Sequence, residues 1–296
     1  MALNLDDIGR RLRAYRLGRN LTAGEVADRI GISRAAVYRL EKGELVKIET
    51  LERLAALLEA PLPSLLGVGV EYYANAVAFF ERMRQIEETA SFVTGNFSPI
   101  SLLLLSDDYI GHLRTMLLEA MPSTAGDVQQ AERQIATVLD LLAERRRMAR
   151  QRATPVASIV ATQDIARFLR LGLIGRFDLP ERVVRERRAA ARVEVERLVG
   201  ILAAQSIGVQ VGVIDEASPT QNFQVLEQPG PGTAVTLSPY RLGELPNVSA
   251  GIAMVTSAPD AVALFTATLK QRWARAHKGE SGARLIRDLI ARAARE

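Results

Sequence analysis

The 296-residue sequence contains no cysteine and only two histidines. The lack of cysteine excludes disulfide bonds and thiolate metal ligands. The two imidazoles, His112 and His277, are too few for the usual zinc or haem ligand sets. We therefore expect no metal site and no cofactor.

Long apolar segments are also missing. The longest apolar run, residues 100–105, is followed by Asp107 and Asp108 and is far shorter than the ~20 residues that span a bilayer. Residues 1–20 lack the charged segment and apolar stretch of a secretory signal. We therefore expect a cytoplasmic protein that makes no contact with a membrane.

The excess of basic residues is small, because the net charge is only +4 over the whole chain. Binding to nucleic acid would therefore need a local basic patch and not a general basic field. The chain is long enough for two domains with a substantial core.

Residues 21–43, LTAGEVADRIGISRAAVYRLEKG, carry the strongest local signals. Thr22 and Glu25 have the spacing of a capping box, which predicts that a helix begins at Thr22. Gly31 suits the left-handed conformation in which helices often end. Ser33 can cap a second helix. The pattern predicts two short helices joined by a tight turn.

The second of these helices has two different faces. Val37 and Leu40 form its apolar face, which we expect to pack on a small core. The residues that we expect to lie away from the core are Arg34, Ala35, Tyr38 and Arg39.

This stretch resembles the helix-turn-helix of the lambda-repressor, or xenobiotic-response-element (XRE), type. The residues that match the family pattern are Leu21, Thr22, Val26, Ala27, Gly31, Ile32, Ser33, Val37, Leu40, Glu41 and Gly43. The resemblance implies an all-α domain of five helices over residues 1–69 that binds a double-stranded DNA operator. Ala23 departs from the pattern, since many members have a glutamine there that touches the DNA backbone.

The resemblance also implies roles for individual residues. The residues expected to contact bases are Arg34, Ala35, Tyr38 and Arg39. Those expected to contact the DNA backbone are Thr22, Ser33, Lys42 and Arg19, because capped helix N-termini and flanking basic residues commonly bind phosphates. An arginine late in the first helix pairs in the family with the glutamate that ends the recognition helix, and the matching residues are Arg16 and Glu41.

Residues 71–93 carry apolar side chains at spacings of three and four, from Tyr73 to Val93. We expect one long amphipathic helix there, within a connecting segment of residues 70–94. This helix would either dimerise with a second copy or pack on its own domain. Its apolar stripe is too short and too aromatic for a clear coiled coil.

The remainder, residues 95–296, alternates between two kinds of pattern. Apolar runs that indicate strands lie at 100–105, 155–161, 208–214, 223–226, 233–238 and 251–257. Helical patterns lie at 106–121, 127–151, 162–172, 180–206, 259–278 and 281–294. This alternation predicts a mixed α/β, or α+β, domain. The order of these elements, and short sequence segments such as PVASIVATQDIARFL, resemble an uncharacterised domain that follows this helix-turn-helix in many bacterial regulators.

Polar residues near the expected strand ends raise the question of catalysis. They are Ser106, Asp107, Asp108, Asp164, Asp215 and Glu216. Acidic residues are equally favoured in the first turn of a helix, and the chain lacks a nucleophile elbow, a P-loop and a dinucleotide fingerprint. We do not expect an enzyme. The basic run 145–152 either binds nucleic acid or an anionic ligand, or lies in solvent at a helix end.

Together, these patterns favour a homodimeric, repressor-like transcription regulator whose C-terminal domain senses an effector or mediates assembly. They do not indicate which residues would bind an effector. Two alternatives stay open: an antitoxin-like or scaffold protein whose C-terminal domain binds another protein, and an enzyme tethered to DNA. An operator affinity that changes with a metabolite would favour a sensor, stoichiometric co-purification a scaffold, and turnover that depends on one carboxylate an enzyme.

Overall fold

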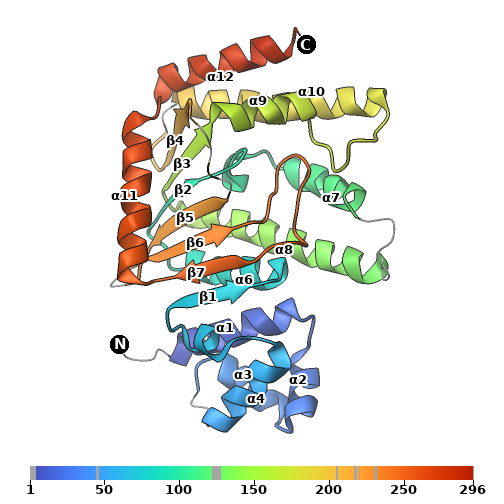
Figure 1. Ribbon diagram of the computed structural model, residues 1–296, viewed down its shortest axis with the longest axis vertical. Coiled ribbons are helices and arrows are strands. Elements are labelled where there is room, and N and C mark those ends of the chain that lie inside the picture. Colours follow the sequence, from blue (N-terminus) through green and yellow to red (C-terminus); the bar gives the residue numbers. More distant parts are fainter. Residues whose placement is uncertain are drawn as a thin grey trace.

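The structure is a computed structural model that describes residues 5–44, 47–121, 128–204, 206–216, 219, 221–229 and 232–295. The molecule is elongated. A group of short helices forms one end, and a larger body built on a twisted sheet forms the rest (Figure 1).

The N-terminal helices, here called the reader, are α1 (Leu5–Gly18), α2 (Ala23–Ile30), α3 (Arg34–Glu41), α4 (Ile48–Leu58) and α5 (Leu62–Leu66). Each turns its apolar stripe inward, and the buried side chains include Leu12, Val26, Val37 and Leu54. Burial of such stripes supplies most of the stability of short helices, because helix propensity alone is too weak at this length.

The body contains one seven-stranded sheet in the part of the chain that is described, with the order β1-β7-β6-β5-β2-β3-β4. Its strands are β1 (Val70–Tyr73), β2 (Phe92–Asn96), β3 (Val156–Ala161), β4 (Val209–Ile214), β5 (Asn222–Glu227), β6 (Ala234–Ser238) and β7 (Ala253–Thr256). β2, β3 and β4 are parallel neighbours, and the other pairs are antiparallel. The expected mixed α/β architecture is confirmed.

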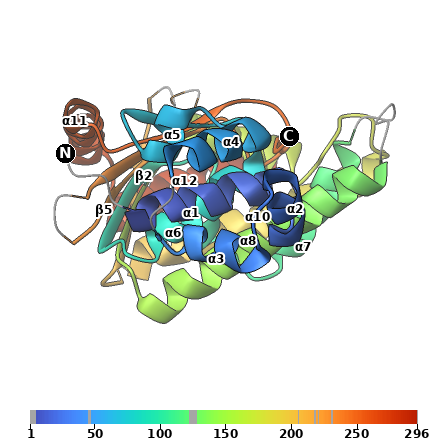
Figure 2. The same cartoon turned by 90° about the horizontal axis from the view of Figure 1, so that it is seen from below.

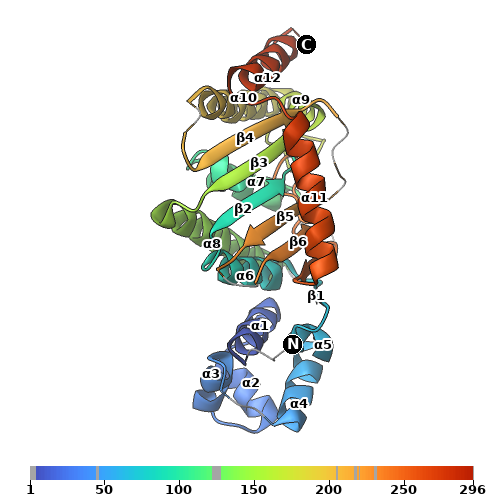
Figure 3. The same cartoon turned by 90° about the vertical axis from the view of Figure 1, so that its left-hand side faces the viewer.

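Helices cover both faces of this sheet. They are α6 (Ala76–Glu87), α7 (Tyr109–Glu119), α8 (Val128–Arg152), α9 (Thr162–Leu171), α10 (Glu181–Ala204), α11 (Pro259–Arg275) and α12 (Gly279–Ala293). α11 crosses one face, while α6 and α8 lie behind the other (Figure 3). Side chains alternate accordingly along β3, where Ile159 joins the core under α11 and Val160 joins the core on the opposite face.

The segment 71–93 is not the single helix that its spacing predicts. Its first residues form β1 and its last residues begin β2, so that only α6 is helical. The Asn75 side chain starts α6 by accepting hydrogen bonds from the backbone N–H of Val77 at 2.8 Å and of Ala78 at 3.2 Å. The flanking strands form because they find pairing partners far along the chain, which a local spacing does not reveal.

The run 100–105 is not a strand either. It contains a short 3₁₀ helix, η1 (Leu102–Leu104), whose start is capped by the Ser101 side chain. Leu104 and Leu105 are buried, so the run is apolar because of burial and not because of sheet pairing. The other five predicted strands are confirmed as β3 to β7. Helices α7 to α12 occur where helical patterns predict them, although Asp127 and residue 205 lie outside the described residues.

Candidate nucleic-acid interface

The turn between α2 and α3 is built by capping interactions. The backbone N–H of Glu25 donates to Thr22 Oγ1 at 3.2 Å, and the Glu25 carboxylate accepts from the Thr22 N–H at 2.7 Å. Gly31 ends α2 with φ 76°, and the Ser33 hydroxyl caps α3 by accepting from the Ala36 N–H at 3.1 Å. These bonds satisfy backbone donors that both helices would otherwise leave unpaired.

The position of α3 is fixed by α1. Arg16 of α1 donates two hydrogen bonds to the Glu41 carboxylate, at 2.5 and 3.1 Å, and a third to the Leu21 carbonyl. Gly9 permits the two helices to touch, because a Cβ atom there would come within 2.5 Å of the Leu40 carbonyl oxygen. The structure therefore brings Arg16 and Glu41 together and holds α3 rigidly against α1.

The four predicted base-contacting residues share the exposed face of α3. Arg34, Ala35, Tyr38 and Arg39 are all exposed, and the aromatic Tyr38 side chain is 42% accessible. Arg34 donates to the Tyr38 hydroxyl at 3.2 Å and stacks on its ring at 5.5 Å. Stacking limits the rotamers of both side chains, so this pair presents a partly ordered surface.

The predicted backbone contacts fall into two groups. Thr22, Ser33 and Lys42 are exposed at the ends of α2 and α3. The Arg19 side chain is already held by the Leu58 carbonyl and the Glu59 carboxylate. A contact from Arg19 to phosphate stays a prediction, and it would have to compete with the Glu59 ion pair.

Ala23 is 3% exposed. Its methyl group belongs to the core of the reader, and the glutamine that many family members place there has no counterpart at this position.

The polar residues near strand ends have structural partners. Ser106 donates to Glu194, Asp107 pairs with Arg146 and Arg150, Asp164 with Arg167, and Glu216 with Arg275, while Asp215 accepts from Thr162. Asp108 lies at the start of α7. Over the described ranges, no three His, Asp or Glu side chains are grouped to hold a metal ion.

The basic run at the end of α8 is largely paired within the chain. Arg145 forms two hydrogen bonds with the Glu87 carboxylate at 2.7 and 2.8 Å. Arg146 donates to the Leu105 carbonyl, and Arg152 donates to the carbonyls of Glu87 and Ala90. These contacts tie α8 to α6 and to η1, and the run is not a free cationic surface.

The sequence patterns miss the residues that attach the reader to the body. α1 lies along α6 (Figure 2). The buried Glu71 carboxylate accepts hydrogen bonds from Arg11 at 2.6 Å, from Arg82 at 2.9 and 3.1 Å, and from the Tyr73 hydroxyl at 2.6 Å. Burial by itself would raise the pKa of Glu71, but the charges of Arg82 and Arg11 outweigh burial and lower it.

We call the attachment formed by Arg11, Tyr15, Glu71, Tyr73 and Arg82 the junction. It includes an aromatic contact. The Tyr15 ring stacks on Tyr73 at 4.9 Å, and its hydroxyl donates to the Tyr72 carbonyl at 2.6 Å. Burial raises the pKa of Tyr15 to about 12. The Ser64 hydroxyl donates to the Val70 carbonyl. The reader thus covers the outer edge of β1 and is held to the body by buried contacts.

Comparison with known proteins identifies one region of the chain. Residues 7–66 match the family model described as a helix-turn-helix domain, and this domain is of the XRE or lambda-repressor type. No curated protein and no solved structure matches the chain. Within the described ranges, no helix is both long and apolar enough to cross a membrane.

Proposed function

Because residues 7–66 are a DNA-binding type of helix-turn-helix domain, we propose that the protein is a homodimeric, sequence-specific transcription regulator. The observation that supports this proposal most is the exposed face of α3, where Arg34 and Arg39 project from a helix capped at its start and fixed by Arg16 and Glu41. DNA readout, and not catalysis, is the proposed activity, and the cytoplasm is its proposed location.

In this proposal α3 enters the major groove. An arginine there donates two hydrogen bonds to O6 and N7 of guanine, a pattern that no other base pair offers. Phosphates on either side of the major groove are bound by Thr22, Ser33 and Lys42, and these contacts fix the position of α3 along the DNA. The contact with Tyr38 restricts the conformation of the Arg34 side chain before DNA binds.

The proposed readout is tested with operators selected from random duplex DNA by the full chain. Arg34→Ala and Arg39→Ala should each relax the preference at one operator position, at a cost of roughly 1–3 kcal/mol. The matched control is Arg185→Ala, which removes an exposed arginine of α10. Unchanged affinity and sequence preference in both reader variants, at fixed salt, would refute docking through α3.

The body is proposed to sense an effector or to mediate assembly of the dimer. α6 offers little surface for the dimer contact, because its side chains from Ala76 to Met83 are all buried within the chain. The contact should therefore come from another surface of the body. The direct attachment of the reader to β1 and α6 supports a body that influences DNA binding and is not merely tethered to it.

A further inference from the structure

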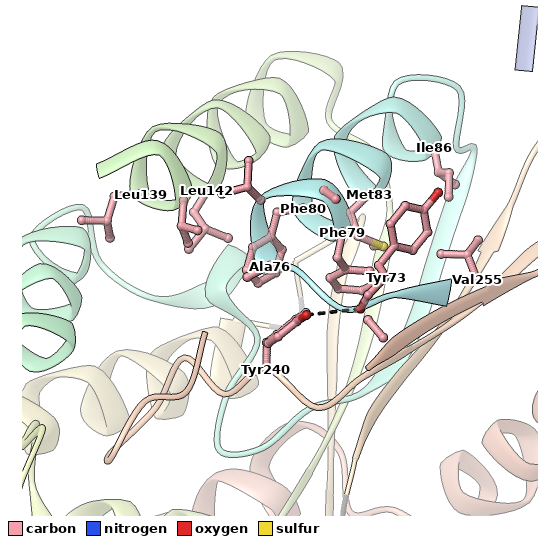
Figure 4. Packing of buried hydrophobic residues seen from close by; sticks show 14 of the residues in the cluster. Tyr73, Ala76, Phe79, Phe80, Met83, Ile86, Leu139, Leu142, Tyr240 and Val255 are labelled. Atoms are coloured by element: carbon pink, nitrogen blue, oxygen red, sulfur yellow. Dashed lines mark hydrogen bonds between the residues drawn. The ribbon is translucent and has the colours of Figure 1, made fainter. Parts of the chain in front are cut away.

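A cavity of about 60 Å³ lies between the sheet, helix α6, the segment 97–103 and Arg145 of α8. Aromatic rings form much of its wall. Phe79 and Phe80 of α6 face Tyr240, with ring centroids 5.8 and 5.9 Å from the tyrosine ring (Figure 4). Phe97, at the end of β2, also lines the cavity. These faces suit a flat aromatic group.

The sheet contributes polar groups to the same cavity. Asn222 and Gln224 of β5 and Ser238 of β6 line it. The register pairs Asn222 with Ser238 and Gln224 with Thr236, so these side chains share one face. Thr236 is not part of the lining but is the neighbour of Gln224 on this face; it is 1% exposed, and its hydroxyl has no hydrogen-bond partner in the described part of the chain. An apolar wall beside a polar sheet is typical of ligand pockets.

The charge at the cavity is already balanced. Arg145 reaches the wall, but its guanidinium pairs with Glu87 and stacks on the Phe80 ring at 5.5 Å. An anionic ligand would have to break this pair or be buried without a counter-ion, and both are costly. The cavity therefore favours a neutral ligand.

We propose that this cavity binds a small, flat, neutral aromatic compound with an amide-like polar edge, and that binding moves α6. The regulatory part of this inference rests on the proposed function, since a change in DNA affinity is its consequence. Cavities that accept benzene measure about 150 Å³. A ring-sized ligand must therefore push the cavity walls apart, and two of the wall residues, Phe79 and Phe80, belong to α6.

α6 transmits such a displacement directly to the reader. Its opposite side packs against α1, where Ala78 lies so close to Gly18 that a Cβ atom on Gly18 would come within 2.6 Å of it. Glu81 pairs with Arg13 at 3.4 Å, and Gln85 donates to the Arg10 carbonyl at 3.1 Å. Since α1 also holds α3, a shift of α6 changes the placement of the recognition helix.

The ligand class is tested on the full chain with three probes of one shape. Benzamide is neutral with a polar edge, benzoate is its anionic counterpart, and toluene lacks hydrogen-bonding groups. Benzamide should bind with a Kd of about 1 mM in protein-observed NMR titrations, as expected for a fragment of its size. Benzoate and toluene should bind about tenfold more weakly.

Two variants locate the site. Gln224→Leu should weaken benzamide binding about tenfold by removing the amide from the cavity. Gln134→Leu is the matched control, because Gln134 is another half-buried glutamine and lines a different cavity beside α7 and α8. Circular dichroism checks folding, and Gln224→Met replaces the first variant if that one does not fold.

The proposal fails if benzamide does not bind, if benzoate binds as tightly, or if Gln134→Leu and not Gln224→Leu removes binding. Its regulatory part is tested on selected operator DNA, where saturating benzamide should change the Kd at least about threefold for wild type and not for Gln224→Leu. If benzamide binds but the Kd for operator DNA stays the same, α6 does not transmit ligand binding to the reader. If the chain selects no operator, the proposed function fails, while the probe titrations still decide the ligand site.

Discussion

At the scale of single residues, we expect different side chains of the reader to contact bases and phosphates. Lys42 is exposed at the end of α3, next to the recognition face. Lys42→Ala should weaken binding to all DNA sequences about equally and reduce the slope of log K against log salt by roughly one unit. Filter binding across a salt series measures both quantities, with Lys270→Ala on α11 as the control. A loss confined to some sequences would instead place Lys42 at a base edge.

Glu71 is the residue on which the junction depends. Glu71→Gln leaves Arg11 and Arg82 buried beside a neutral group, which should lower the free energy of unfolding by roughly 3–5 kcal/mol. Glu280→Gln is the control, since it alters an exposed ion pair with Arg287 and should change stability little. Urea unfolding of the full chain measures the difference. Equal stabilities of the two variants would contradict a stabilising role for the junction.

The pKa of Glu71 gives this effect a pH dependence. Its carboxyl has a lowered pKa in the folded protein, so the unfolded chain binds the proton more readily. The stabilisation by Glu71 is therefore present above the unfolded pKa of about 4.3 and is lost as pH falls through the folded value. The difference between wild type and Glu71→Gln should stay constant near neutral pH and shrink only in acid.

At the scale of elements, the crossing of α1 and α6 depends on the absence of a side chain at Gly18. Gly18→Ala should destabilise the full chain, because its Cβ would overlap that of Ala78. Gly111→Ala is the matched control in α7, where nothing lies within 4 Å of the added Cβ. There the exchange should be neutral or stabilising by up to about 1 kcal/mol. Thermal unfolding of both variants decides whether the crossing is as tight as the structure indicates.

At the scale of the whole molecule, we expect a homodimer that binds two half-sites about 34 Å apart. The full chain should sediment as a dimer at micromolar concentration. Residues 1–69 alone should be monomeric and bind an operator much more weakly, because they lack the body. They should also unfold more easily, since Arg11 loses Glu71 and Tyr15 loses Tyr73. A full chain that is monomeric at this concentration and still binds its operator tightly would contradict the predicted homodimer.

The sequence by itself determined the features that depend on neighbouring residues. Thr22 and Glu25 specify the start of α2, Ser33 starts α3, and Gly31 permits the turn between them. These signals are local, because a cap and its partner lie within three residues. The apolar runs of β3 and of residues 211–214 in β4 could also be recognised in the sequence, since a strand buried on both faces needs apolar residues on both.

Only the tertiary structure decided which distant segments meet. β1 exists because Val70 pairs with Thr256, and no spacing within residues 70–94 contains that partner. The cavity brings together Phe80, Gln224 and Tyr240, and the junction brings Arg11 to Glu71. Pairing and burial of this kind depend on the folded position of the whole chain. This is why the helix-turn-helix domain could be predicted from residues 21–43, while its attachment to the body could not.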